Sequence, residues 1–585
     1  MKNFLAFEAL PQALSTSKKQ AFLFALARLF VFLLLIGTAI VGATDNPMVL
    51  ALLLPESVLF IWLIQRFNQE KDLQAYLIER LSMQEEKAMR AERNLSRFDQ
   101  GVEFQDKNHP FSSDLDLFGP HSLFQLINHT VSSSGKSLLA GRMMEPLFPA
   151  KAKERFVSVQ ELRKYNELLE DFEATGRAFL KNEKPKKDFY HWLKKPEAWS
   201  AFHFLPLFIG PVTGMLLTWA TIFGIWPTGY LGIWIIISVL VLATVNRPLT
   251  IAAKLMPDQG DVKTFRIWAE RLSRESFTDP NLQQLHAPFQ NGQKGTLRGL
   301  STLEQLSFLI QNRFNLMYLV FNMLFWLDFY LLWKTKSWKT DYANLLAGLE
   351  SNFDEWQYLV SLAAFSNEEN LEGSINWTGD SELSTKNIKH PLLPKEKAIG
   401  NDFNISQSQK TILLTGSNMS GKTTFMRTLG INMVLANLGL QPFAEDMHIG
   451  DFQLYTSMRN ADNLGENVSS FYAELARIRR ILHAAEAGEQ VFFLMDEILK
   501  GTNTADRIQG SEALILQLAS TQSKGIISTH DIELSQLSST LAYLVNKSFH
   551  SEIQARNIHF DYKLKEGPCP NFNAHKLMEL MGIKF

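Results

Sequence analysis

The 585-residue sequence contains almost no cysteine and almost no net charge. Its one cysteine, Cys569, excludes an intrachain disulfide framework and fits a reducing compartment, where we expect an inert thiol. A net charge of -2 provides no global basic field, so the composition does not point to nucleic acid, although a local basic patch stays open. His109, His121 and His129 are not at metal-ligand spacing, and we expect them in the core or at the surface.

Apolar residues make up 46% of the chain but gather in a few long runs. Residues 21–44 and 47–64 are apolar except for Arg28 and Glu56, and each run is long enough to cross a hydrocarbon core of about 30 Å. This pattern predicts a transmembrane hairpin in which Arg28 and Glu56 can pair. The alternative is a cleaved signal peptide ending near residues 41–43, which would leave the second run unexplained.

A second pair of runs, 204–226 and 229–245, contains no charged residue and predicts a clearer membrane hairpin. Residues 181–195 precede it with six lysines against two acids. By the positive-inside rule, both hairpins then have cytoplasmic ends and external turns. The lysine cluster either contacts anionic lipid head groups or forms a solvated loop. The protein is thus expected in a bacterial-type inner membrane.

A fifth apolar run covers residues 316–333 but contains Asp328. We expect a long buried helix here, because an odd number of spans would put its flanks on opposite sides of the membrane. The polar segment 371–389 predicts a domain boundary. The predicted parts are a transmembrane hairpin (1–66), a helical linker (67–101), a helical domain (102–389) with an inserted transmembrane hairpin (203–246), and a nucleotide-binding domain (390–585).

A phosphate-binding loop opens the last domain. Residues 411–415 favour a strand, Gly416 and Gly421-Lys422-Thr423 follow at the spacing G-x-x-x-x-G-K-[ST], and a helical pattern runs to about Asn437. Glycines let backbone N–H groups converge on phosphate, and the helix N-terminus adds positive partial charge. Lys422 is suited to the β- and γ-phosphates of ATP, and the Thr423 hydroxyl to Mg²⁺. The predicted nucleotide contacts of this loop are Gly416, Ser417, Asn418, Met419, Ser420, Gly421, Lys422, Thr423 and Thr424.

Polar residues also follow two further apolar strands. Residues 490–495 lead into Asp496, a candidate Mg²⁺ ligand, and Glu497, a candidate for polarising the attacking water. Residues 525–529 lead into His530, which is suited to contact the γ-phosphate or that water. With Lys422, Glu497 and His530 form the predicted catalytic set, and Thr423 and Asp496 the predicted metal ligands.

Ser469 and Ser470 precede a helix that runs to about Ala485 and form an anion site with its N-terminus. The γ-phosphate of the nucleotide bound by the same chain is already assigned to the phosphate loop. This predicts that the serines serve a partner's nucleotide, and hence a homodimer.

Together these motifs resemble the MutS family of DNA mismatch-repair ATPases, which are ABC-type. The resemblance rests on residues 415–425, Ser469-Ser470-Phe471 with Glu474, residues 494–504, residues 529–534 and His390-Pro391, and more weakly on 122–135. It implies an α/β P-loop (ABC-type) ATPase domain C-terminal to a mainly α-helical MutS-core-like domain, here with transmembrane helices. It also implies Mg²⁺-dependent ATP hydrolysis, and a subunit seam holding Asn503 and Asp506.

The departures from the family concern DNA. Residues 1–100 replace the mismatch-reading domain, and the Phe-x-Glu at Phe353-Asp354-Glu355 lies deep in the helical region. The hairpin 203–246 sits roughly where the family carries its DNA clamp. The family's adenine-stacking Phe corresponds to Ala398 or Ile399, and Tyr562 is the alternative aromatic contact.

Three functions compete. The first is a membrane-anchored, MutS-like ATPase whose nucleotide-driven dimer closure moves helical arms, with the ATPase domain in the cytoplasm and an unidentified client. The second is a mismatched-DNA-binding repair factor, for which the sequence offers only the lysines of 181–195. The third is an ABC-type transporter component, which four spans and the absence of Leu-Ser-Gly-Gly disfavour.

Overall fold

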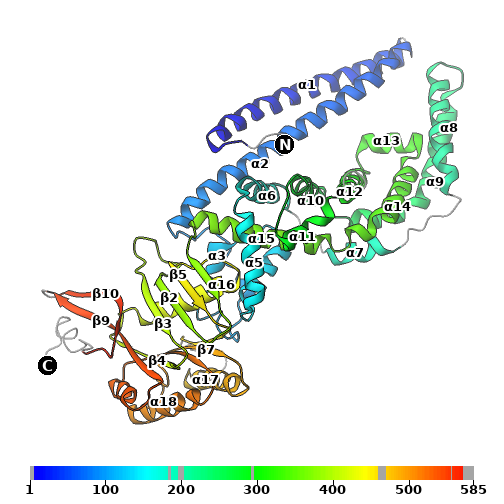
Figure 1. Cartoon of the computed structure of the whole chain (residues 1–585). Coiled ribbons are helices and arrows are strands. Elements are labelled where there is room, and N and C mark those ends of the chain that lie inside the picture. The colour runs from blue at the N-terminus through cyan, green and yellow to red at the C-terminus, as the bar shows by residue number, and fades with distance from the viewer. Residues whose placement is uncertain are drawn as a thin grey trace. The chain divides into compact units, whose positions relative to one another are not determined.

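A computed structural model describes residues 5–45, 47–181, 186–195, 203–290, 295–458, 470–554 and 557–570, with helices and strands labelled in Figure 1. The chain forms two compact units. The first contains residues 1–86, 131–135 and 165–357, and the second contains residues 87–130, 136–164 and 358–585. Residues 87–130 and 136–164 therefore cluster with the nucleotide-binding region rather than with the rest of the expected helical domain.

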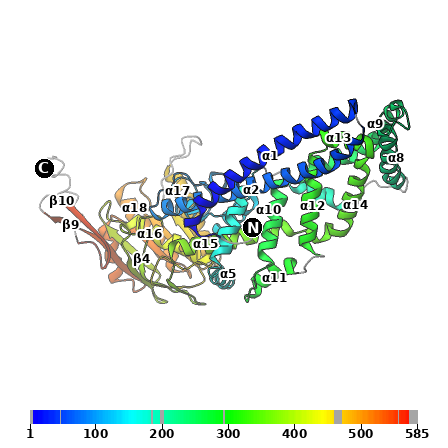
Figure 2. The same ribbon diagram turned by 90° about the horizontal axis from the view of Figure 1, so that it is seen from above.

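The N-terminal hairpin consists of α1 (Leu10–Thr44), a 3-10 turn η2 (Pro47–Leu52) and α2 (Leu53–Ala91), and its two helices lie side by side (Figures 1 and 2). One uninterrupted helix, α2, thus holds residues 53–64 of the second apolar run and most of the helical linker. The expected pairing of Arg28 with Glu56 is wrong. Glu56 accepts a 2.9 Å hydrogen bond from the Thr38 hydroxyl, and the Arg28 guanidinium lies 4.8 Å from the centroid of the Phe67 ring.

The rest of the first unit is helical and packs around aromatic side chains. Trp268 stacks on Phe172 at 4.2 Å between ring centroids and donates its indole N–H to the Phe172 carbonyl at 2.7 Å. Phe353, the phenylalanine of the Phe-x-Glu in the helical region, is buried against the same Trp268. The helices are α6 (Asn166–Phe179), α7 (Lys186–Lys194), α8 (Phe204–Ile222), α9 (Thr228–Leu255), α10 (Gln259–Leu272), α11 (Pro280–Gln290), α12 (Thr296–Gln311), α13 (Leu316–Phe325), α14 (Leu327–Leu346) and the first part of α15 (Leu349–Glu369), which belongs to the second unit from residue 358.

The fifth apolar run is not the long buried helix that the sequence predicts. It is split into α13 and α14, which meet at 93°. The break is at Trp326, whose φ of +56° is left-handed and cannot continue a right-handed helix. α13 is also largely exposed, with Leu316 at 75% and Val320 at 50%. A side-chain preference for burial could not reveal a backbone reversal at one tryptophan.

The second unit contains two sheets. A four-stranded sheet has the order β1-β5-β2-β3, from β1 (Ser374–Trp377), β5 (Asp446–Ile449), β2 (Leu383–Ile388) and β3 (Asn401–Ile405). Strands β1 and β2 lie within 371–389, so the segment predicted as a polar boundary is part of this sheet. Hydrogen bonds to β5 and β3 order its polar residues.

A six-stranded sheet has the order β10-β9-β4-β8-β7-β6, parallel except for the β9–β10 hairpin. Residues Ile412–Leu414 of β4 and Val491–Met495 of β7 are buried, as expected for central parallel strands. Its strands are β4 (Thr411–Gly416), β6 (Gln453–Ser457), β7 (Val491–Asp496), β8 (Lys524–Thr529), β9 (Leu544–Gln554) and β10 (Asn557–Glu566).

The helices of the second unit include the one expected after the phosphate loop, which runs from Lys422 to Asn437 as α16. Helix α17 packs Ile478 and Ile481 into a core with β7 and α18. The histidines without metal spacing contact main-chain oxygens: His109 that of Met144 and His121 that of Leu392. The other elements are η1 (Phe7–Ala9) in the first unit, and η3 (Val102–Phe104), α3 (Leu123–Ile127), α4 (Ser133–Met143), α5 (Pro149–Leu162), α17 (Ser470–Glu486), α18 (Thr504–Ala519) and η6 (Ile532–Ser539).

Candidate nucleotide site

The site lies where β4, β8 and β7 end side by side. Pairing is parallel, with Thr415 of β4 opposite Thr529 of β8, and Asp496 of β7 opposite Ser528 of β8. The loops after parallel strands leave from one edge of a sheet, which is where α/β folds bind ligands. Three segments far apart in the sequence therefore bring Lys422, Asp496 and His530 to one place.

The phosphate loop has the backbone that its sequence requires. Met419 and Gly421 have φ of +68° and +104°. A Cβ on Gly421 would lie 3.1 Å from the Tyr562 ring, so both conformation and space favour glycine there. The predicted contacts Asn418, Met419 and Thr424 are exposed, whereas Ser420 is buried.

The Lys422 ammonium lies within the loop, where it donates to the carbonyls of Gly416 at 2.9 Å and Ser417 at 3.1 Å. Burial disfavours its charge and lowers the pKa of Lys422 to about 8, although the nearby Asp496 carboxylate opposes this. Phosphate oxygens in the same loop would provide the anionic partner that this lysine needs.

The metal candidates meet directly. The Thr423 hydroxyl donates to Asp496 Oδ2 at 2.5 Å, and the Ser528 hydroxyl donates to Asp496 Oδ1. Hydroxyl and carboxylate oxygens are hard ligands, and Mg²⁺ in nucleotide sites takes one or two such groups together with phosphates and water. The residues present therefore fit Mg²⁺, with Thr423 and Asp496 positioned to hold it.

Glu497 is held between two basic side chains. Its Oε1 lies 2.7 Å from His530 Nε2, and Oε2 forms an ion pair with Lys500. Burial, together with the positive Lys422 and Lys500, lowers the pKa of His530 to about 4, so the imidazole is neutral at physiological pH. A neutral imidazole with its proton on Nε2 donates to the carboxylate and fixes its orientation.

A buried carboxylate connects α17 to this segment. Glu474 is 5% exposed and its Oε1 accepts the backbone N–H of Leu499, whose φ is +60°. Burial raises the pKa of Glu474, whereas hydrogen bonds from the Leu499 and Lys500 backbones oppose that rise. Left-handed non-glycine residues persist only where the surroundings hold them. Glu474 thus supports the backbone next to Glu497.

The predicted trans-acting residues divide into two groups. Ser469 lies outside the described residues, and Ser470 is the first residue of α17. Asn503 caps α18, accepting the Asp506 backbone N–H at 3.0 Å and donating to its carboxylate at 2.7 Å. Asn503 and Asp506 therefore have a local role at a helix start, whatever they contact in an assembly.

Tyr562 is the base-contact candidate that lies beside the phosphate loop. It sits in a register shift of β10 between Phe560 and Leu564, with φ of +51° and 43% of its surface exposed. The Asn401 amide holds this bulge by donating to the Tyr562 carbonyl and accepting the Leu564 N–H. Bulges redirect a side chain, and here the ring reaches Gly421. Ile399 is 40% exposed, and Ala398 lines a groove of about 510 Å³ with Arg93 and His390.

The sequence motifs did not point to Ser528 or Lys500, and they left Glu474 without a role. Ser528 lies on β8 two residues before His530, which directly follows the strand, so alternation along the strand end was the available signal. Lys500 follows Glu497 by three residues, a spacing that brings side chains together in a turn. No local signal places Glu474 against Leu499, because 24 residues and a strand separate them.

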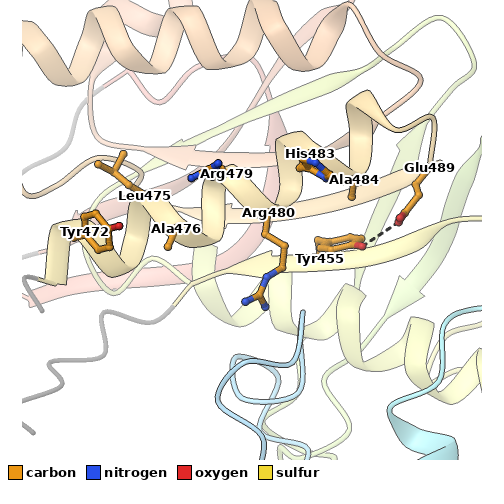
Figure 3. Close-up of a pocket in the computed structure, with 9 residues that line it drawn as sticks. All are labelled: Tyr455, Tyr472, Leu475, Ala476, Arg479, Arg480, His483, Ala484 and Glu489. Carbon is orange, nitrogen blue, oxygen red and sulfur yellow. Dashed lines mark hydrogen bonds between the residues drawn. The ribbon is translucent and has the colours of Figure 1, made fainter. Parts of the chain in front are cut away.

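A separate groove of about 520 Å³ lies on the outward side of α17, above β6 (Figure 3). Tyr472, Arg479, Arg480 and His483 line it, and the Tyr455 hydroxyl donates to Glu489 at its edge. None of its lining residues belongs to the predicted nucleotide site, so the two are distinct surfaces of the same domain.

Comparison with known proteins agrees with this geometry. Residues 412–583 match the family profile described as MutS domain V. DNA mismatch repair proteins MutS of Listeria innocua serovar 6a and Listeria welshimeri serovar 6b are each 30% identical over 261 residues, covering 43% of this chain and 30% of the relative. MutS of Geobacillus sp. (strain WCH70) is 29% identical over 246 residues, covering 41% of this chain and 28% of the relative. The C-terminal part of the chain is therefore a MutS-type, ABC-type P-loop ATPase domain.

Proposed function

We propose that this protein is a membrane-anchored, dimeric ATPase that converts ATP binding and hydrolysis into movement of its helical regions. The observation that carries the proposal is the meeting of Lys422, Thr423, Asp496, Glu497 and His530 at one sheet edge, in a chain that also exposes long apolar helices. The chain spans about 30% of the length of its MutS relatives, so the DNA chemistry in their names is not assumed for it.

Catalysis is assigned to the chain's own side chains. Lys422 binds the β- and γ-phosphates, and Mg²⁺, when held by Thr423 and Asp496, neutralises phosphate charge. Glu497 orients and polarises the attacking water, and neutral His530 fixes the Glu497 carboxylate in the productive direction. Lys500 is placed to exchange its ion pair with Glu497 for the anionic nucleotide.

Membrane anchoring is supported by four helices long and apolar enough to cross a bilayer within the described chain. Only 6–22% of the residues in their most apolar windows are buried. Leu54 is 75% exposed, Leu240 70% and Phe30 68%. Soluble proteins rarely expose continuous apolar surfaces of this size, whereas lipid covers them without cost.

The dimer is supported by the place of Ser470 at the start of α17, on the helix whose Glu474 holds the catalytic segment of its own chain. A nucleotide bound across a seam by the Ser469–Ser470 segment would therefore affect both sites. The second candidate is a mismatched-DNA-binding repair factor, favoured by the names of the relatives. A salt titration of DNA binding separates the two, because phosphate contacts give a steep dependence on salt.

The central test uses the reconstituted full chain. Glu497→Gln should bind ATP but lose about 10²–10⁴-fold in turnover, the range of a general base. Lys422→Ala should lose nucleotide binding, whereas Glu489→Gln, an exposed glutamate outside the site, should behave as wild type. Equal turnover of Glu497→Gln and wild type would contradict the assignment.

The composite site is tested by mixing two inactive chains in one bilayer. Lys422→Ala keeps its serines but cannot hold ATP, and Ser469→Ala/Ser470→Ala holds ATP but cannot complete its partner's site. A mixed dimer rebuilds one site of two, so activity should recover towards half. No recovery despite co-assembly would mean that each site is complete within its own chain.

A further inference from the structure

We propose that the bend between α13 and α14 forms a binding site for an anionic phospholipid of the cytoplasmic leaflet. Its acyl chain lies in an apolar notch and its phosphate lies beside Lys334. The notch is defined by Phe204, Leu207 and Pro211 of α8 and Leu327, Tyr330 and Trp333 of α14, which enclose about 470 Å³. The site rests on the proposed membrane anchoring and adds a specific lipid to it.

The bend is built into the fold by Trp326. Its ring stacks on Trp234 of α9 at 4.7 Å, and its indole N–H donates to the Ser238 hydroxyl at 2.7 Å. The Trp234 indole donates to the Leu324 carbonyl at 3.0 Å, and the Asn322 side chain accepts the Asp328 N–H at 2.9 Å. Broken helices occur at membrane depth where protein groups satisfy the freed backbone in this way.

Glycines of α8 bring this bend against the span. A Cβ on Gly214 would lie 1.9 Å from the Leu324 carbonyl oxygen, and one on Gly210 would lie 2.6 Å from the Trp326 Cβ. Small residues permit close approach between helices in membranes. This close contact fixes α14 at an angle to α8. The notch is the space between the two helices on the side of the contact towards the start of α8.

Position along the spans sets the depth of the notch. Ser238 is about 15 Å from the external end of α9, and Gly210 about 18 Å from the external end of α8, at 1.5 Å per residue. Trp326, which touches both, therefore lies near the middle of a hydrocarbon core of about 30 Å. The notch residues of α8 precede Gly214 towards the lysine-rich end, so the notch opens in the cytoplasmic leaflet.

The segment formed by α13 and α14 begins and ends on the same side of the membrane. Arg313, before α13, pairs with Asp328, at the start of α14, with 3.0 Å between Nε and Oδ1, and both side chains are at most 5% exposed. Arg313 also reaches Asn246 on α9, which is 18 residues, or about 27 Å, from that helix's external end. We infer that α13 and α14 enter and leave on the cytoplasmic side, so that this bent pair adds no complete span to the four apolar helices.

An acyl chain is the occupant that the surroundings favour. The rim is itself lipid-facing, with Phe208 67% and Leu205 60% exposed on α8 and Tyr330 45% exposed on α14. The volume lies in the range of about 300–1,000 Å³ that small-molecule pockets have. A water-soluble ligand would have to cross this apolar surface to reach the notch.

The charge around the open end favours an anionic head group. Lys334 lies one helical turn beyond Tyr330, with its ammonium 5.9 Å from that ring's centroid, and Lys336 follows. Asp328, the carboxylate of the first two turns of α14, is already paired with Arg313. Aromatic side chains followed by lysine mark the membrane interface, where lysine reaches lipid phosphate.

The test reconstitutes the full chain in phosphatidylcholine nanodiscs that contain phosphatidylglycerol with a photoactivatable acyl chain. Adducts are located by mass spectrometry of the peptides. We expect them on residues 204–211 and 327–333, and fewer with phosphatidylcholine that carries the same chain. Leu207→Trp, which fills the notch, should reduce them severalfold. Lys334→Glu should reduce them about fivefold or more, the effect of one surface lysine on anionic lipid.

Two control variants distinguish specific lipid binding in the notch from general exposure of the helices to lipid. Val212→Trp changes an exposed α8 residue outside the notch, and Lys254→Glu an exposed lysine at the end of α9; neither should alter the adducts. Adducts on α1 and α9 but not in the notch, an even spread along α8, or equal labelling by both lipids would overturn the site alone. Absence of adducts from all four apolar helices would instead contradict membrane anchoring.

Discussion

The ATPase sheet and the apolar hairpins use similar side chains in opposite ways. In β4, β7 and β8 the apolar residues are buried and the chemistry lies in the polar residues at the strand ends. In α1, α8 and α9 many large apolar residues are exposed, and the buried positions include glycine and serine, such as Gly210, Gly214 and Ser238, as well as apolar residues. One region therefore excludes water from its interior, whereas the other presents its apolar surface to its surroundings.

Hydrophobicity alone therefore does not distinguish a protein core from a membrane-facing surface. What separates them is the position of the small and polar residues. A soluble core places them outside, and a lipid-facing bundle places them between its helices. Run 316–333 shows both patterns, because α13 exposes Leu316 while Asp328 and Trp326 are buried.

Among the tests of this contrast between the two regions, the largest expected effect comes from placing a charge at one exposed apolar residue. Leu240→Arg on α9 should lower insertion of its hairpin about 100-fold, since arginine near a span's centre costs about 2.5–3.5 kcal/mol. Labelling of Thr228→Cys by an impermeant maleimide from outside measures insertion, because the native Cys569 is buried. Leu240→Phe is the matched control. Unchanged or increased maleimide labelling of Leu240→Arg would place α9 in water and contradict its exposure to lipid.

The next effect concerns the polar groups at the edge of the ATPase sheet. Glu474→Ala leaves the Leu499 N–H without its acceptor, so we expect a stability loss of about 1–3 kcal/mol. Displacement of Glu497 should lower ATP turnover about 10- to 100-fold. Glu474→Gln still offers an acceptor oxygen and should retain most activity, and Glu486→Ala on the same helix should be neutral. Wild-type turnover of Glu474→Ala at a temperature where it is folded would contradict this role.

A smaller effect is expected at the base-contact position. Tyr562→Ala should weaken ATP binding about tenfold, because stacking of a base on an aromatic ring contributes about 1–3 kcal/mol. Tyr562→Phe keeps the ring and should bind nearly as wild type. Fluorescent-nucleotide titration measures both. If the two substitutions weaken ATP binding equally, the hydroxyl rather than the ring contacts the nucleotide.

The smallest expected effect is the uptake of part of a proton when ATP binds. Burial lowers the pKa of Lys422 to about 8. Above pH 7, a fraction of the nucleotide-free molecules therefore has a neutral Lys422 side chain. Phosphate favours the charged form, so ATP binding should take up about half a proton at pH 8, and affinity should fall as the pH rises further. Calorimetry in two buffers of different ionisation enthalpy measures this uptake. Lys422→Arg, charged throughout, should abolish it, and zero uptake by wild type would contradict the lowered pKa.

Much of the nucleotide site could be predicted from the sequence, because each part is local. The glycines, Lys422 and Thr423 occupy one turn, and Asp496-Glu497 and His530 each end an apolar strand. Residues that act from another element could not be found in this way. Glu474 reaches Leu499 only because α17 packs beside β7, and Tyr562 reaches Gly421 only because a bulge in β10 redirects it.

The nature of each segment could be predicted from its own residues: a phosphate loop in a parallel sheet, and apolar runs long enough to span a bilayer. These follow from residue type and spacing along a single strand or helix. Three outcomes could not be predicted in this way: Arg28 and Glu56 do not pair, α2 continues unbroken to Ala91, and the chain reverses at Trp326. Those outcomes depend on partners distant in sequence, such as Trp234 and Ser238, whose hydrogen bonds and ring stacking favour a left-handed backbone that local preference would reject.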